Sequence, residues 1–486
     1  MRVLRGFHVT RFRLVGCVLL PFAAGYYLSY LFRTINALIA TDLTAELGLG
    51  AADLGLLTSV YFLVFAAAQL PFGVLLDRHG PRTIQSALLL LASVGALVFA
   101  LADSLAGLVL GRALIGLGVA LALMAGFKAI VLWFPAERLA LVNGWFVMLG
   151  ALGAVTATAP AEVIVQAVGW RGLFAVLGSL SAVAALLILV IVPECQLPPT
   201  PKTRRPISLW IIYRDRRFWR LAPLSAVGVG TSWSLQGLWA ASWLRDVDGF
   251  DRAGIVQLLS IMAVAVSASG LVLGLAADRL RRFGVKIEDV LASTIVVSMV
   301  AQVSLVLGWP VPASIAWSAI AAAGAATVLS YAILAEYFPK QASGRANAAL
   351  NIMHVGMAFV LQYVTGLVIE QWPVANDHYP ASAHQCAMSL TLVLQVASVA
   401  WFGLASRRRR SAPALQSLVE QVSAHGAARP AHDLIRFGVP VATRNSAGAW
   451  RAATAASALV CIVLMACVLW ASGQASIAAH VIEVAR

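Results

Sequence analysis

The stretch Gly73-Val-Leu-Leu-Asp77-Arg78-His79-Gly80-Pro81-Arg82 decides how this chain folds. It follows an apolar run at 53–76 and precedes another at 84–102. Each run reaches roughly 20 residues, the length of a helix that crosses about 30 Å of hydrocarbon. We therefore interpret the stretch as a polar turn between two membrane-spanning helices.

The rest of the chain has the same character. Of its 486 residues, 60% are hydrophobic and 12% are charged, whereas about 25% of the residues in soluble domains are charged. Long apolar runs recur along most of the sequence, in place of the short alternating segments of a β-barrel. The composition predicts an all-α polytopic membrane protein.

The formal net charge of +14 could indicate a nucleic-acid partner. However, the basic residues gather in alternate connections, for example at 2–13, 78–82 and 407–410. The connections between them contain no Lys or Arg: 41–52, 103–105, 308–312 and 371–384. This alternation is typical of cytoplasmic loops in membrane proteins. It predicts a lipid bilayer partner, no nucleic acid, a cytoplasmic amino terminus and location in the bacterial inner membrane.

Apolar length and Gly or Pro breaks predict twelve spanning helices, at 14–40, 53–76, 84–102, 106–134, 140–162, 170–192, 221–244, 253–277, 287–307, 312–337, 346–370 and 385–405. Residues 1–192 and 221–406 would form two six-helix bundles, joined by a cytoplasmic connector at 193–220. A basic cytoplasmic segment at 407–447 and a thirteenth helix with its tail at 448–486 would follow. That helix is either a simple anchor or a docking helix for a protein partner.

Two landmarks repeat along the chain. Gly73-x-x-x-Asp77-Arg78 reappears as Gly274-x-x-x-Asp278-Arg279, an offset of 201 residues. Trp133-Phe134-Pro135 reappears as Tyr337-Phe338-Pro339, an offset of 204. Two similar offsets at corresponding turns indicate a duplicated six-helix unit.

The Gly73–Arg82 loop resembles the signature loop of the major facilitator superfamily, and Gly111-Arg112-Ala-Leu-Ile-Gly116-Leu-Gly118 looks like that family's second motif. The resemblance covers residues 10–406 and implies two six-helix halves that rock against each other in alternating access. In the second copy, Leu280-Arg281-Arg282-Phe283 replaces the Gly-Pro turn. The gating residues that the resemblance implies are Gly73, Asp77, Arg78, Gly80, Arg82, Asp278 and Arg279.

The loop chemistry gives each residue a role. Gly73 would let its helix approach a neighbour closely, and Gly80 would supply a positive-φ turn. Asp77 could cap a helix or pair with a cation across the interface between the halves. The alternative is a plain cytoplasmic turn without a gating role.

Residues 26–33, Tyr-Tyr-Leu-Ser-Tyr-Leu-Phe-Arg, resemble the first helix of the organophosphate:phosphate antiporters and related organic-anion carriers, which place an arginine there. Lys128 stands where those carriers often have a second cation. Tyr26, Tyr30 and Arg33 share one helix face by their spacing. Two cations in a cavity would attract an anion; the alternative is that both side chains extend to the headgroups.

Other polar and aromatic residues extend the candidate binding set. Trp233, Gln236 and Trp239 would form an aromatic wall with one amide, although such tryptophans are also common at helix contacts. Asn351 and His354 share a face, and their alternative role is interhelical hydrogen bonding. For coupling, the candidates are Arg112, Asp53 and His354. The alternative for Arg112 is that its side chain extends to the membrane interface and has no coupling role.

We predict a secondary transporter of a small organic anion, bearing a carboxylate or a phosphate, that works by symport or antiport. The alternatives are an exporter of amphipathic compounds or siderophores and a non-transporting receptor or scaffold with the same fold. Nitrate carriage is disfavoured because the helices at 53–76 and 253–277 lack the paired arginines that such carriers use. The chain has no HExxH, GxSxG or GxxxxGK[ST] motif, so we expect no enzyme activity, nucleotide, metal or other cofactor.

Overall fold

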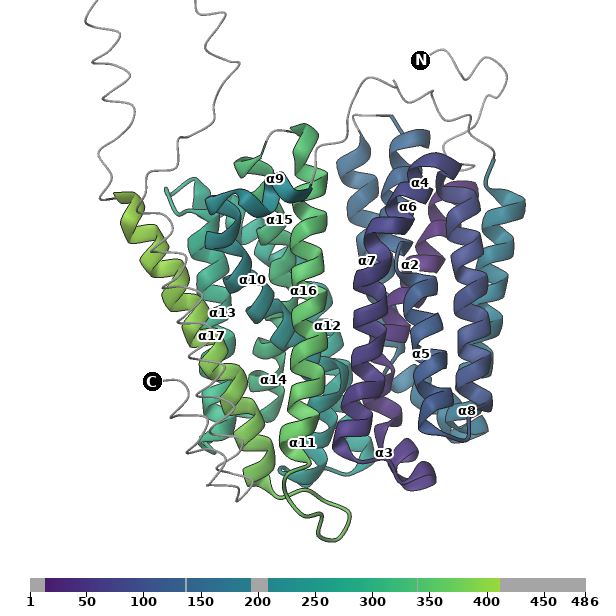
Figure 1. Ribbon diagram of the computed structural model, residues 1–486, viewed down its shortest axis with the longest axis vertical. Helices are drawn as coiled ribbons and strands as arrows, with labels where there is room; N and C mark the ends of the chain where they lie inside the picture. Colours follow the sequence, from purple (N-terminus) through teal and green to yellow (C-terminus); the bar gives the residue numbers. More distant parts are fainter. Residues whose placement is uncertain (1–13, 136–137, 194–208, 339, 411–486) are drawn as a thin grey trace, which may run out of the picture. The chain divides into compact units, whose positions relative to one another are not determined.

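The computed structural model describes residues 14–135, 138–193, 209–338 and 340–410 (Figure 1). We call residues 14–193 the first half and residues 209–399 the second half. The helices of the first half are η1 Val15–Leu19, α2 Leu20–Thr34, α3 Asn36–Leu47, α4 Ala51–Leu101, α5 Leu105–Val119, α6 Ala122–Trp133, α7 Leu139–Thr156 and α8 Ala159–Ile191.

The second half is built in the same way. Its helices are α9 Leu209–Arg214, α10 Arg216–Ser234, η3 Leu235–Trp239, α11 Ala240–Asp246, α12 Arg252–Arg281, α13 Ile287–Val306, α14 Ala313–Ala322, η4 Ala323–Ala326, α15 Thr327–Tyr337, α16 Lys340–Ile369 and α17 Ala381–Arg410. Both halves belong to one compact unit that extends to Val399. The predicted segments at 411–447 and 448–486 lie outside the described residues.

Ten helical stretches in the described residues are long and apolar enough to cross a membrane. The apolar helix at Leu141–Thr156 is shorter, and the continuous run α10–η3–α11 carries more polar residues. The all-α polytopic prediction is confirmed.

The polar turn predicted at Gly80 is confirmed. Helix α4 changes direction at this residue, which has φ 81° and ψ 163°. A glycine adopts that backbone conformation without the steric cost of a Cβ. In the second half, Gly284 has φ 81° between α12 and α13, so the second copy of the turn also relies on a glycine. The side chain of Asp278 lies outside the described residues.

Two predicted helix boundaries were wrong. The first helix does not continue to residue 40, because α2 ends at Thr34 and α3 begins at Asn36. Residues 159–168 belong to α8, which changes direction at Gly169 with φ 70°. Apolar length alone does not reveal the helix break at Ile35 or the bend at Gly169, since the chain stays hydrophobic and helical on both sides.

Helix breaks recur at corresponding places in the halves. Between α5 and α6, Ser29 Oγ donates to the carbonyl of Val119 at 3.4 Å. At the α14–η4 break, Ser232 Oγ donates to the carbonyl of Ala321 at 3.1 Å. The serines are 203 residues apart (232 − 29), and the acceptors are 202 apart (321 − 119). A hydroxyl can satisfy a carbonyl that a broken helix leaves without its usual partner.

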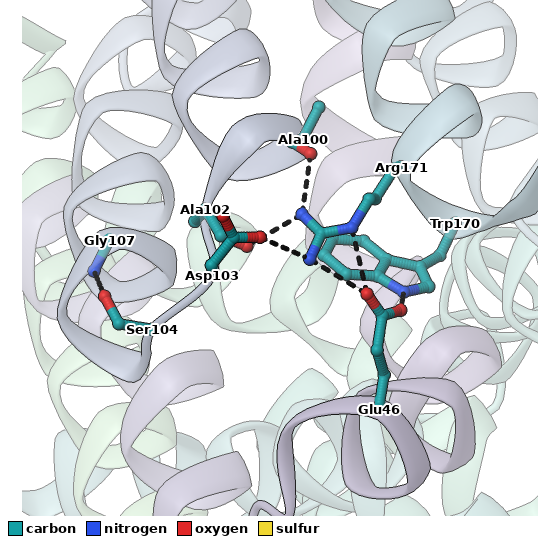
Figure 2. A network of polar contacts seen from close by, with 8 residues as sticks. All are labelled: Glu46, Ala100, Ala102, Asp103, Ser104, Gly107, Trp170 and Arg171. Carbon is teal, nitrogen blue, oxygen red and sulfur yellow. Dashed lines mark hydrogen bonds and ion pairs between the residues drawn. The ribbon is translucent and has the colours of Figure 1, made fainter.

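Figure 1 places α3 and α11 at one end of the helices and α9 at the other. We call the end with α3 and α11 the far end, and the end with α9 and the Gly80 turn the connector end. At the far end, Figure 2 shows a polar network around Arg171, at the start of the long segment of α8.

Arg171 ties three elements of the first half together. Its guanidinium donates to Glu46 Oε1 at 2.9 and 3.0 Å and to Asp103 Oδ1 at 2.9 Å. It also donates to the carbonyls of Ala100 and Ala102 at 2.9 and 2.7 Å (Figure 2). The hydrogen bond from the indole of Trp170, together with Arg171, lowers the pKa of the Glu46 carboxyl. Helix α3 is therefore fixed to its own half.

The two halves meet closely at the far end. A Cβ added at Gly366 in α16 would lie 2.6 Å from the carbonyl oxygen of Ala51 in α4. A Cβ at Gly55 would lie 3.1 Å from the carbonyl oxygen of Gln362. The hydroxyl of Tyr379 accepts a hydrogen bond from the Ala51 N–H at 3.2 Å. Glycine is needed where the two helix backbones approach this closely.

Candidate functional site

Arg33 lies at the end of α2, two residues before the helix break at Ile35. Its guanidinium carbon is 4.0 Å from the ring centre of Tyr30 and 4.8 Å from that of Trp233 in α10. Aromatic faces attract a cation at these distances. The predicted shared face of α2 is confirmed, since the rings of Tyr26 and Tyr30 are 5.2 Å apart. The cation thus contacts aromatic rings from both halves.

Among the described residues, no carboxylate forms an ion pair with Arg33. Arg33 is partly exposed, and a guanidinium carries five N–H donors in its own plane. A carboxylate or phosphate oxygen pair can bind there with two parallel hydrogen bonds.

The second half supplies a polar wall beside Trp233. The hydroxyl of Tyr331 in α15 donates to Asn351 Oδ1 at 2.9 Å. The ring of His354 in α16 lies 6.0 Å from the rings of both Trp233 and Tyr331. The structure therefore brings Arg33, Tyr30, Trp233, Asn351 and His354 into one connected set.

His354 is fully buried and hydrogen-bonded on one side. Its Nε2 is 2.7 Å from the hydroxyl of Ser225, which lies 2.6 Å from the hydroxyl of Ser330. Its Nδ1 has no hydrogen-bond partner among the described residues. The ring can therefore accept or donate one further hydrogen bond, depending on its tautomer.

Tyr331 is the site residue that we did not predict. The repeat could have revealed it, because Tyr331 lies 203 residues after Lys128 (331 − 128), the same offset that relates Ser232 to Ser29. The same offset relates Gln236 to Arg33 (236 − 33), so the second half has an amide where the first half has its cation.

Lys128 is not placed as a second cation at this site. Its ammonium donates to Asp77 Oδ1 at 2.8 Å and to the carbonyl of Leu76 at 2.8 Å. Lys128 therefore joins α6 to α4 within the first half, near the Gly80 turn. The spacing of residues along the chain could not reveal this pairing, because it depends on how α6 packs against α4.

Trp239 and Gln236 lie in η3, and both are buried. The Trp239 indole donates to the carbonyl of Gln362 at 3.2 Å, and its ring contacts the Gly55 region of α4. The placement of Trp239 thus favours helix packing at the far end, the alternative that the sequence left open.

Arg112 is fully buried, which excludes an arginine that extends to the membrane surface. Its Nη1 donates to the carbonyl of Phe32 at 2.9 Å, and its guanidinium carbon lies 5.1 Å from the ring centre of Tyr61. Its Nε and Nη2 have no hydrogen-bond partner among the described residues. Arg112 supports the backbone of α2 directly before Arg33. Asp53, another of the three coupling candidates, accepts the Gly50 N–H at 3.1 Å and caps α4.

Asp77 and Arg82 of the loop have partners within their own half. Asp77 binds Lys128 rather than a cation across the interface. Arg82 donates to the carbonyl of Leu189 through Nε and Nη2, and Arg78 is exposed. A Cβ at Gly73 would meet no atom of the described residues within 4 Å, so among them the expected close approach of a neighbour is absent in this conformation.

The second half has a similar link near its own turn. There, Arg281 in α12 pairs with Glu336 in α15 at 3.1 Å. Arg279, the other described gating candidate of this turn, is exposed at the end of α12. Each turn is therefore held to its own half by an ion pair. The turn residue is the acid in the first half (Asp77) and the base in the second half (Arg281).

The fold and the site define a polytopic helical membrane protein in which a cation and aromatic rings meet between two halves, the arrangement of a secondary transporter. The chain belongs to the Major Facilitator Superfamily, whose family model matches residues 22–361. The family and the relatives below are transporters rather than enzymes.

Three curated relatives illustrate the similarity. A nitrate/nitrite transporter of Picosynechococcus sp. is 33% identical over 129 residues, which are 26% of this chain and 24% of the relative. A probable L-galactonate transporter of Escherichia coli is 32% identical over 162 residues, 32% of this chain and 34% of the relative. The hexuronate transporter of Escherichia coli is 26% identical over 268 residues, 51% of this chain and 62% of the relative. The chain thus matches less than two thirds of the length of each.

Solved structures share the fold. A bacterial homologue of the human lysosomal transporter Spinster, in an inward-facing and unoccupied conformation, superimposes with a TM-score of 0.67 at 19% identity. The superposition covers 82% of this chain and 98% of that one. The nucleoside transporter NupG superimposes with a TM-score of 0.65 at 14% identity, covering 80% and 99%. The predicted fold of this superfamily is confirmed.

Proposed function

We propose that the protein moves a small organic anion across the bacterial inner membrane by alternating access, and that Arg33 binds the anionic group. One observation carries the proposal: Arg33 lies between Tyr30 and Trp233 without a carboxylate partner in the described part of the chain. An unpaired charge inside a membrane protein is costly unless it serves a ligand or pathway.

The substrate class follows from the groups around Arg33. A carboxylate would bind the guanidinium, while the partly exposed Asn351 and Tyr331 offer hydrogen bonds to hydroxyl groups. The aromatic rings of Tyr30 and Trp233 would pack against the carbon skeleton. These features suit a sugar acid, and the hexuronate transporter and the probable L-galactonate transporter among the relatives support that choice.

The placement of basic residues indicates which end of the protein faces the cytoplasm. Basic residues gather at the connector end, so this end should face the cytoplasm with the amino terminus. Hydrogen bonds and ion pairs join the halves at the far end, and a Cβ added at Gly73 or Gly274 near the connector end would meet no described atom within 4 Å. We interpret the conformation as closed to the outside and open to the cytoplasm.

A thermal-shift screen of the purified protein tests the proposal. Sugar acids, dicarboxylates, phosphate esters and nitrate should be compared at equal ionic strength, since stabilisation grows as RT ln(1 + [L]/Kd). We expect stabilisation by sugar acids, and its loss in Arg33→Gln. Arg78→Gln is the matched control, because Arg78 is an exposed loop arginine. Stabilisation by nitrate alone, or equal stabilisation of Arg33→Gln, would contradict the assignment.

A further inference from the structure

Arg252, at the start of α12, is the residue that joins the two halves electrostatically at the far end. Its Nη1 and Nη2 donate to the two carboxylate oxygens of Asp42 at 2.8 and 3.0 Å. Its Nε and Nη2 donate to those of Glu162 at 2.6 and 3.0 Å. Asp42 lies in α3 and Glu162 in α8. One cation of the second half therefore holds two carboxylates of the first half, each by two hydrogen bonds.

Arg171 offers an internal comparison. It also lies at the far end and also pairs with two carboxylates, Glu46 and Asp103. Both of its partners belong to the first half (Figure 2). When the halves rotate as rigid bodies, the contacts of Arg171 persist, whereas all four hydrogen bonds of Arg252 must break.

The acceptors of Arg252 are held in place before it binds. Asp42 lies one helical turn before Glu46, so the Arg171 network fixes its position on α3. The side chain of Glu162 is only 8% exposed and also accepts a hydrogen bond from Gln166 at 3.1 Å. Preorganised acceptors lose little conformational entropy when the cation arrives.

The cluster also has a route for solvent. A cavity of about 560 Å³ lies beside it, lined by Glu162, Gln166, Arg252, Gln257 and Ser260, among others. Water in this cavity could solvate the carboxylate of Glu162 when Arg252 leaves it. Without that solvation, a buried charge that loses its partner is strongly disfavoured.

We propose that Arg252, Asp42 and Glu162 form a far-end latch that holds the outer gate closed and sets the ratio of closed to open molecules. This inference rests on the alternating-access proposal above, but not on the identity of the substrate. Because the Arg252 side chain is 40% exposed, each pair should favour closure by no more than about fivefold. Together they should favour it by about tenfold, equivalent to about 1.4 kcal/mol.

The test is a distance measurement between two spin labels at the far end. Cysteines would replace Val168 in the first half and Trp309 in the second, both about half exposed, in full-length protein without its five native cysteines. Double electron–electron resonance in nanodiscs, without substrate, then gives the populations of short and long distances. We expect Arg252→Gln to raise the ratio of long to short distances about tenfold, and Arg171→Gln to leave it unchanged.

The latch proposal predicts two further results. The pair Asp42→Asn and Glu162→Gln should give the same shift as Arg252→Gln, and adding Arg252→Gln to that pair should add nothing. High salt should increase the long-distance population of the wild type but not that of Arg252→Gln, because salt screens exposed ion pairs.

Two outcomes would overturn the latch. In one, Arg252→Gln leaves the ratio unchanged although substrate shifts it. In the other, Arg171→Gln shifts the ratio as much as Arg252→Gln does. A single distance population in every variant, with and without substrate, would instead overturn the alternating-access proposal, and the latch with it.

Discussion

Replacing Gly366 by alanine should open the far end. The new Cβ would lie 2.6 Å from the carbonyl oxygen of Ala51 and 3.2 Å from the Cα of Ala52. Both atoms belong to the backbone of α4 in the other half, so no side chain can move aside. Carbon and oxygen normally stay more than about 3 Å apart, so the two helices would have to separate by several tenths of an ångström.

The size of the effect follows from overpacking. Forcing an extra methyl group into a packed contact costs about 1–3 kcal/mol. Because that cost applies only when the far end is closed, the ratio of open to closed molecules should rise by about 5- to 150-fold. The assay is the same spin-label distance between positions 168 and 309.

Gly356→Ala is the matched control on the same helix. A Cβ at Gly356 meets nothing within 4 Å, so the substitution should raise thermal stability through helix propensity, by up to about 1 kcal/mol, without changing the distances. Equal distance distributions for Gly366→Ala and Gly356→Ala would refute the argument that close backbone contact defines the closed far end.

Three further predictions concern pH, substrate affinity and the loop. Burial and the nearby carboxylate of Asp53 raise the pKa of Glu370 above its ordinary value of 4.5 when the far end is closed. Opening would separate the two carboxyl groups and remove this shift. Protonation of Glu370 in acid should therefore favour far-end closure, and its deprotonation at rising pH should favour opening. Glu370→Gln should abolish this pH dependence of the spin-label distance above pH 4.5, and an unchanged dependence would exclude the pair as its origin. Trp233→Leu should weaken substrate affinity about 5- to 30-fold, through loss of about 1–2 kcal/mol of cation–π and packing contact; unchanged affinity by calorimetry would remove Trp233 from the site. Asp77→Asn should slow transport more than it weakens substrate binding, because its partner Lys128 holds the loop and not the ligand; parallel loss of both would show that the loop is not a gate.

Much of the fold could be predicted from local patterns. Apolar length and charge placement revealed the helices, and the requirement for a positive φ identified the turn at Gly80. The repeat was visible because duplicated turns need the same small and charged residues. The helix break at Ile35 was missed because a break between two apolar helical segments leaves no change in composition.

The candidate site was only partly predictable. Spacing correctly placed Tyr30 and Arg33 on one face, because residues three apart are neighbours on a helix. It could not show that Trp233, 200 residues later (233 − 33), packs against Arg33 while Lys128 pairs with Asp77. The Arg252–Asp42 pair joins residues 210 positions apart. Such pairings depend on how the two halves meet, which helix periodicity does not report.

Charge discrimination at Arg33 tests the central claim most directly. The measurement compares the uptake into proteoliposomes of a labelled hexuronate and of its uncharged parent hexose, for the wild type, Arg33→Lys and Arg33→Gln. The wild type should prefer the acid strongly, Arg33→Lys should retain part of the preference, and Arg33→Gln should lose it. Uptake of the acid by Arg33→Gln at the wild-type rate would contradict the account.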